Sequence, residues 1–183
     1  MTTLFITPKD LKANTILNGN VDTDLFIQFI KIAQQMHLQN YLGTKLYDAI
    51  TLKIDTNTLT GDYLNLVSDY VQPMLIHFAM VDYLPFANYQ VRNGGVFKHR
   101  TDNSENVSKE ELDILVQKHR TFADFYAKRF VDYMAINASA MFPEYWTNSN
   151  SDMYPDTKPN PIGWVLWYGK GKTKRTETTN LQG

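Results

Sequence analysis

Ser108-Lys109-Glu110-Glu111 opens the stretch that decides the fold of this chain. A serine followed three residues later by a glutamate is a capping box, in which the two side chains each accept a hydrogen bond from the other residue's backbone amide. Apolar residues then recur at intervals of three and four for about seven turns, which indicates one face of an amphipathic helix. This face consists of Leu112, Leu115, Val116, Phe122, Ala123, Tyr126, Phe130, Tyr133 and Met134.

Helical signals also precede this stretch. Thr7-Pro8-Lys9-Asp10 predicts a short helix, because threonine can cap a helix and proline suits its first turn. A longer helix follows Asp22 or Thr23, and its predicted apolar face consists of Leu25, Phe26, Phe29, Ile30, Ala33 and Met36. Tyr41-Leu42-Gly43-Thr44 interrupts the pattern, which resumes from Leu46 to Ile54.

A third long helix is predicted from Thr60 or Asp62 to about Leu84, after a loop-like segment 55–61. Pro73 lies inside this helical pattern, so we expect a kink or an unpaired backbone carbonyl there. Pro85 is expected to weaken or end the helix. Asn93-Gly94-Gly95 is the strongest turn signal in the chain and is compatible with a short hairpin.

The predicted fold is therefore mainly α: a bundle of four to five helices over residues 1–140, with a possible short β-hairpin. An extended C-terminal arm is predicted over residues 141–183, because Pro155, Pro159 and Pro161 interrupt regular structure there. The arm contains an apolar cluster from Trp164 to Tyr168 and then a basic, polar end.

Composition restricts the class of protein. The chain has 183 residues, 43% of them hydrophobic, and a formal net charge of −1, which argues against a strongly charged surface for nucleic acid. The absence of cysteine excludes disulfides, thiolate zinc sites and a cysteine nucleophile. No signal peptide is visible, and no apolar run approaches the ~20 residues that cross a bilayer. We expect a soluble protein without a membrane partner.

No motif predicts catalysis or cofactor binding. The histidines are His37, His77, His99 and His119, and none is spaced to share a metal on one helix face. We expect all four to be structural or exposed. Glu-x-x-His motifs, a Gly-x-Ser-x-Gly motif, a phosphate loop and a dinucleotide fingerprint are absent from the sequence. We therefore predict no enzyme, no cofactor and no metal.

The predicted function of the arm is to bind partner proteins. Tryptophan and tyrosine are favoured interface anchors, and the aromatic candidates are Trp146, Tyr154, Trp164, Trp167 and Tyr168. The basic candidates are Lys170, Lys172, Lys174 and Arg175. These basic residues are open to three interpretations: contact with nucleic-acid phosphates, a solvated tail, or docking on an acidic partner. A small nucleic-acid-binding protein is thus the alternative function.

The order of several motifs resembles the head–tail connector proteins of tailed bacteriophages, also called adaptor or head-completion proteins. The resemblance covers roughly residues 4–138 and includes the Pro-bearing third helix and the Gly94–Val96 turn. Its other motifs are Ile6-Thr7-Pro8-Lys9-Asp10-Leu11, Asn40-Tyr41-Leu42-Gly43-Thr44-Lys45-Leu46-Tyr47 and His119-Arg120-Thr121-Phe122-Ala123-Asp124-Phe125-Tyr126.

The resemblance implies a structural virion protein without enzymatic activity. Such proteins form a ring, usually of twelve copies, that binds the portal protein, extends the DNA channel and docks the tail or lower neck proteins. It also implies assembly in the host cytoplasm and a final location in the virion neck. A near-neutral chain is compatible with DNA that passes through without specific binding. A ring additionally requires two different patches on each subunit, and the arm is predicted to supply one of them.

Overall fold

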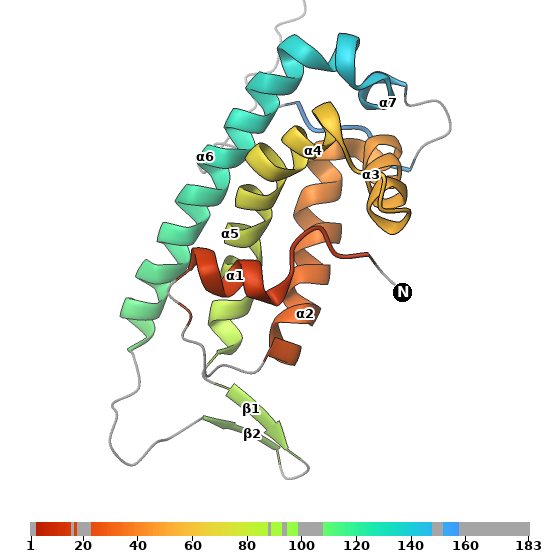
Figure 1. The fold of residues 1–183 in the computed structure, drawn as a ribbon. Helices are drawn as coiled ribbons and strands as arrows, with labels where there is room; N and C mark the ends of the chain where they lie inside the picture. The colour runs from red at the N-terminus through yellow and green to blue at the C-terminus, as the bar shows by residue number, and fades with distance from the viewer. Residues whose placement is uncertain are drawn as a thin grey trace, which may run out of the picture.

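The computed structural model describes residues 3–15, 17, 23–87, 89–92, 95–98, 108–147 and 152–157 (Figure 1). Its helices are α1 (Pro8–Asn14), α2 (Thr23–Ala33), α3 (Gln39–Asp55), α4 (Gly61–Leu66), α5 (Gln72–Tyr83), α6 (Lys109–Met141) and α7 (Pro143–Trp146). Two π-helical turns, η1 (Gln34–Leu38) and η2 (Val67–Val71), and a 3₁₀ turn, η3 (Leu84–Phe86), join them. The predicted mainly α bundle is confirmed.

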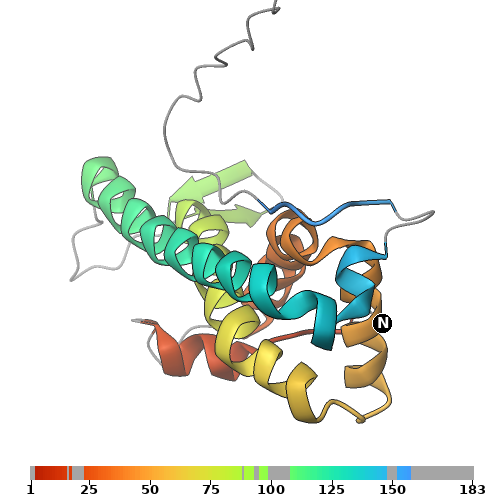
Figure 2. The same ribbon diagram turned by 90° about the horizontal axis from the view of Figure 1, so that it is seen from above.

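Helix α6 is the longest element, and its most extensive contact is with α5 (Figures 1 and 2). The predicted capping box is present: the Glu111 amide donates to Ser108 Oγ at 3.2 Å, and the Ser108 amide donates to Glu111 Oε2 at 3.0 Å. Ala123, Phe130 and Met134 of the predicted face are buried. Phe122 is 47% exposed, so its inclusion in that face was wrong. It lies at the edge of the buried stripe, toward His77.

Helix α2 buries Phe26, Phe29, Ile30 and Ala33, as its spacing predicts. Met36, placed on the same face, is instead 59% exposed, because the π-helical turn η1 shifts the phase of the residues after Ala33. The turn brings Gln34 into the core in its place. This buried amide is satisfied, since it accepts from the Phe5 amide at 2.9 Å and donates to the Thr3 carbonyl at 3.0 Å.

Pro73 is accommodated by η2, the π-helical turn that precedes it. Proline has no N–H to donate to the carbonyl of Asp69, four residues earlier. The Arg129 guanidinium on α6 donates to that carbonyl instead, at 3.0 Å, and lies over the Tyr70 ring at 4.5 Å. The predicted defect in the helix is thus present, and a side chain from another helix satisfies its carbonyl.

Two short strands lie beyond the end of α5 (Figure 1). Strand β1 (Tyr89–Arg92) pairs antiparallel with β2 (Gly95–Lys98), and Val91 is opposite Val96. Helix α5 ends at Tyr83 and Pro85 lies in the 3₁₀ turn that follows, as expected for a proline at the end of a helix. Within the described part of the chain, no helix is both long enough and apolar enough to cross a membrane.

Candidate partner-binding site

The first part of the predicted arm belongs to the helical body. Phe142 and Tyr145 are 0% and 1% exposed, and both join the same core as α5 and α6. Phe142 packs edge-on against Tyr63 at 5.1 Å, and Tyr145 packs edge-on against Phe130 at 6.3 Å. This packing differs from our prediction that the body ends at residue 140 and the arm begins at 141. The segment 141–146, Met-Phe-Pro-Glu-Tyr-Trp, contains a proline that indicates the end of a helix. Its aromatic side chains are nevertheless large enough to contribute to the hydrophobic core.

Helix α7 is also held by a polar contact with α4. The Tyr63 hydroxyl donates to Glu144 Oε2 at 2.7 Å, across 81 positions of sequence. Burial, and then the hydrogen bond and negative charge of Glu144, raise the pKa of Tyr63, so the phenol remains a neutral donor. Lys53 lies over the same ring at 4.4 Å. The turn between α6 and the C-terminal segment is therefore fixed by both apolar and polar contacts.

Residues 152–157, which we call the strap, lie against a kink in α3 (Figure 2). The kink is at Gly43, where φ is 69° and ψ is 159°, a region that is essentially restricted to glycine. It frees backbone groups from the helix. The Thr44 amide donates to the Met153 carbonyl at 3.1 Å, and the Asp156 amide donates to the Asn40 carbonyl at 2.7 Å.

Further contacts complete the seat of the strap. Thr44 Oγ1 accepts from the Met153 amide at 3.0 Å and from Gln39 Nε2 at 3.4 Å. Pro155 lies so close to Gly43 that a Cβ on the glycine would be 2.7 Å from the proline Cδ. The predicted interruption at Tyr41-Leu42-Gly43-Thr44 is confirmed. The strap packs against α3 at this interruption.

Two of the predicted partner-binding residues lie in the described part of the chain, and both are accessible. Trp146, at the end of α7, is 52% exposed, and Tyr154, in the strap, is 69% exposed. Their neighbours differ from them: Tyr145 is buried in the core, and Pro155 lies against Gly43. The remaining candidates lie outside the described residues: Trp164, Trp167, Tyr168, Lys170, Lys172, Lys174 and Arg175.

A pair of histidines was missed by sequence reasoning. His77 on α5 and His119 on α6 approach with their Nδ1 atoms 3.1 Å apart. Burial, and then the neighbouring His119, lower the pKa of His77 to about 4, and burial lowers the pKa of His119 as well. Spacing within one helix cannot reveal a pair formed between two helices. The available signal was that both histidines fall in apolar helical stretches that had to pack on each other.

Metal-binding side chains do not converge in the described part of the chain. His37 Nε2 lies 3.3 Å from Asp82 Oδ2, but no group of three or more histidine and acidic residues there is placed to hold a metal. His37 also stacks on Phe78 at 4.3 Å. These contacts are those of a structural histidine between η1 and α5.

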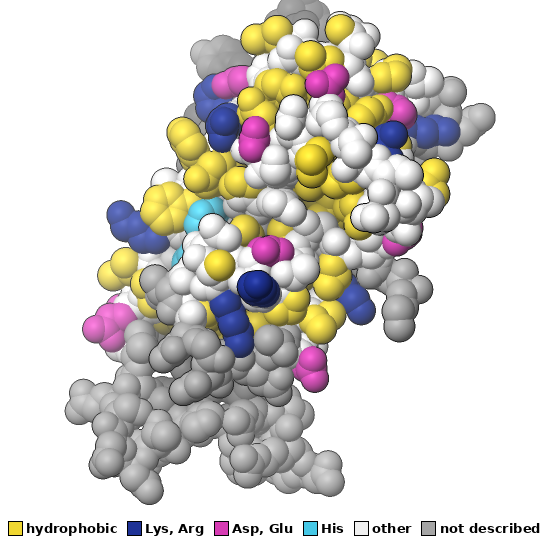
Figure 3. All heavy atoms as spheres, viewed as in Figure 1, with side chains coloured by type: hydrophobic (Ala, Val, Ile, Leu, Met, Phe, Trp, Pro, Cys, Tyr) yellow, Lys and Arg dark blue, Asp and Glu magenta, His cyan; other side chains and the backbone are white. Residues whose placement is uncertain are grey.

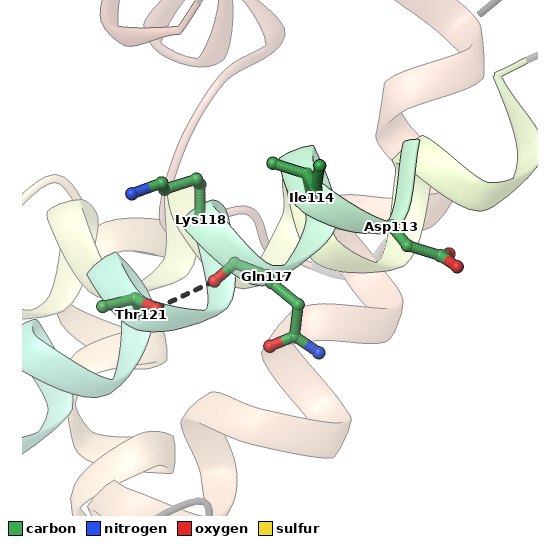
Figure 4. Close-up of a pocket in the computed structure, with 5 residues that line it drawn as sticks. All are labelled: Asp113, Ile114, Gln117, Lys118 and Thr121. Carbon is green, nitrogen blue, oxygen red and sulfur yellow. Dashed lines mark hydrogen bonds between the residues drawn. The ribbon is translucent and has the colours of Figure 1, made fainter. Parts of the chain in front are cut away.

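The surface hollow on α6 has a simple lining (Figure 4). It measures about 390 Å³, and all five described residues that line it come from successive turns of this one helix. Two of these residues are joined by an ordinary helical contact, in which Thr121 Oγ1 donates to the Gln117 carbonyl at 2.9 Å. Within these five residues there is no nucleophile paired with a base, so the hollow presents no recognisable catalytic arrangement.

The visible surface has no dominant charge. Figure 3 shows basic and acidic side chains scattered among hydrophobic ones over the face presented in Figure 1. Contact with a nucleic-acid backbone favours clustered lysine and arginine. This face therefore offers no basic patch to such a partner.

Comparison with known proteins relates this chain to one protein family. The model of a family of unknown function (DUF6712) matches residues 38–160, more than half of the chain. The matched region includes the kinked helix α3, α6, α7 and the strap. No curated protein matches the chain, and no solved structure does. The chain therefore belongs to this family of unknown function.

Proposed function

We propose that this chain is a structural virion protein of the head–tail connector type. It forms a ring between portal and tail, extends the DNA channel and docks the tail or lower neck proteins. DNA passes through without specific binding, and the protein has no catalytic role. The order of motifs that resembles the connector proteins supports this proposal, and so does the mainly helical body.

The observation that carries the proposal is the fixed exit of the C-terminal segment. The hydrogen bonds of Thr44 and Asn40 hold the strap, which ends at residue 157, on the body. The aromatic cluster that starts at Trp164 follows only seven residues later, within roughly 25 Å of extended chain. A segment tied at its base loses less freedom on binding than a loose tail, which favours its use as a docking element.

A closed ring also needs a second, different patch on each subunit. Ile114, Phe125 and Ile136 on α6 are 60%, 62% and 79% exposed. They are spaced by eleven residues, close to three helical turns, and so share one face of α6. This apolar line supplies a patch distinct from Trp146 and Tyr154. The presence of two such patches supports a head-to-tail arrangement of subunits.

The proposal is tested by co-sedimentation with the portal protein of the same virus. The full chain, a chain ending at Thr157, and a full chain with Lys170, Lys172, Lys174 and Arg175 changed to alanine are compared. We expect the full chain to sediment with the portal and the shortened chain to remain in solution. Binding of DNA by the full chain, lost in the alanine variant and steeply salt-dependent, would instead favour the alternative function. Equal sedimentation of all three chains would contradict the role assigned to the arm.

A further inference from the structure

The contact between α5 and α6 contains a hydrogen bond between two histidines. The Nδ1 atoms of His77 and His119 are 3.1 Å apart, whereas the ring centroids are 5.3 Å apart. The two nitrogens therefore lie between the rings and point toward each other. Such a bond requires one ring to carry its proton on Nδ1 and the other to carry it on Nε2, because one nitrogen must donate and the other accept. The pair is thus a defined neutral state with opposite tautomers.

Aromatic rings and neutral polar groups surround this pair. Tyr126 stacks on His77 at 5.7 Å with an interplanar angle of 14°, and Phe122 lies 5.2 Å from the same ring. His119 is 8% exposed. His77 also lines a cavity of about 270 Å³, together with the polar side chains of Asn14, Ser68, Gln72 and Tyr126. The cavity gives protons a route to His77, while the described residues of its lining are neutral and provide no charge that would stabilise an imidazolium.

Charged groups occur on every element around the pair, but none of the described ones forms an ion pair with either ring. They include Lys12 on α1, Asp69 on η2, Asp82 on α5, and Lys118, Arg120 and Asp124 on α6. Two ion pairs in other parts of the helical body join His37 to Asp82 and Lys128 to Asp132. Among the described residues neither ring has a carboxylate partner. Burial opposes the charged form of both rings, and the pKa of each is lowered.

We propose that the His77–His119 bond is an acid-sensitive latch that closes the contact between α5 and α6. The first proton adds to Nε2 of the donor ring, which leaves the Nδ1–H···Nδ1 bond intact and strengthens it by charge. The second proton must occupy the accepting Nδ1. Two Nδ1–H groups cannot face each other at this distance, and two positive charges repel, so the second protonation opens the latch.

The effect on stability has a defined sign. Above the ordinary histidine pKa of 6.5 both states of the protein hold the rings neutral, and the latch is closed. As the pH falls below 6.5, the unfolded chain takes up protons that the folded pair resists. The folding equilibrium then weakens about tenfold per pH unit for each extra proton bound by the unfolded state. For His77 this loss continues down to a pH of about 4, where the folded ring also becomes protonated.

Nitrogen NMR of the histidine rings in the full wild-type chain tests the latch directly. At pH 7.5 we expect opposite tautomers, with one of the two rings protonated on Nδ1 and the other on Nε2. On acidification both rings should titrate below the ordinary histidine range, in two separate steps. If both rings instead carry the proton on Nε2 and titrate near pH 6.5, the latch does not exist.

Stability measurements on variants provide the second test. Asparagine places a neutral polar group near the position of Nδ1, so His119→Asn should fold at pH 7.5. Its stability should fall less steeply than that of the wild type as the pH drops below 6.5. The matched control is His37→Asn, which removes a histidine that faces Asp82. It should not reduce the slope. A slope in His119→Asn that equals that of the wild type would overturn the proposal.

Discussion

Gly43 and Pro155 lie so close together that only glycine fits beneath the proline. A Cβ at position 43 would be 2.7 Å from Pro155 Cδ and 2.8 Å from Cγ, well inside van der Waals contact. The positive φ of Gly43 independently disfavours any other residue. One position thus serves two purposes: it kinks α3 and it makes room for the strap.

Gly43→Ala should lower the free energy of unfolding by about 3 kcal/mol, because backbone strain and overpacking against Pro155 both contribute. Gly61→Ala is the matched control. Gly61 also has a positive φ, of 60°, but nothing lies within 4 Å of its missing Cβ, so the loss should be about 1 kcal/mol. Urea denaturation of both variants measures the difference. Equal losses would mean that contact with the strap adds nothing.

Two truncations should differ sharply in stability. A chain ending at Thr157 keeps every described core residue and should unfold within a few degrees of the full chain. A chain ending at Met141 loses Phe142 and Tyr145, both buried, and large-to-small changes at such aromatics cost about 3–5 kcal/mol each. That sum is comparable to the whole stability of a typical domain. Circular dichroism during heating checks both chains, and a stable chain ending at Met141 would contradict the packing described for α7.

The Arg129 bond to the Asp69 carbonyl predicts an effect that depends on Pro73. Arg129→Met should cost about 1 kcal/mol, near the low end for an unsatisfied acceptor because the contact is close to solvent. Lys128→Met, which removes an exposed ion pair with Asp132, should cost less than about 0.5 kcal/mol. In a Pro73→Ala background the regained N–H can serve the carbonyl, so the Arg129→Met cost should shrink. A double-mutant cycle tests this, and an unchanged cost would refute the compensation.

Trp146 and Tyr154 should matter for binding and not for folding. Because both are more than half exposed, Trp146→Ala with Tyr154→Ala should change the free energy of unfolding by less than about 1 kcal/mol. Binding to the portal should weaken at least tenfold, the scale of an interface anchor. Tyr133→Phe, at a partly buried tyrosine on α6, serves as a control for both assays. Unweakened binding in the double variant would exclude these two residues from the interface.

Local patterns in the sequence predict those parts of the fold that depend on neighbours in the chain. The Ser108–Glu111 capping box, the Thr7 cap and the interruption at Gly43 all follow from residue types at short spacing, and all are present. The defect at Pro73 is predictable for the same reason. The hydrogen bond that satisfies the Asp69 carbonyl is not predictable in this way, because its donor, Arg129, is 60 positions away in the sequence.

The wrong predictions have a common physical origin in tertiary packing. Met36 leaves the predicted face because one π-helical turn changes the phase, and no residue type announces such a turn. Phe142 and Tyr145 lie in a proline-containing segment that resembles a linker. Both nevertheless pack into the hydrophobic core of the helical body. The His77–His119 pair depends on how two helices align. Of the candidate site, Trp146 and Tyr154 lie within the described residues, and both are exposed.

The mass of the full chain in solution, with and without the portal protein of the same virus, tests the central claim most directly. Light scattering or native mass spectrometry provides this measurement. The connector proposal predicts a monomer alone that becomes a closed ring of many copies on the portal. A chain that stays monomeric and unbound in the presence of the portal and of the other neck proteins would contradict it.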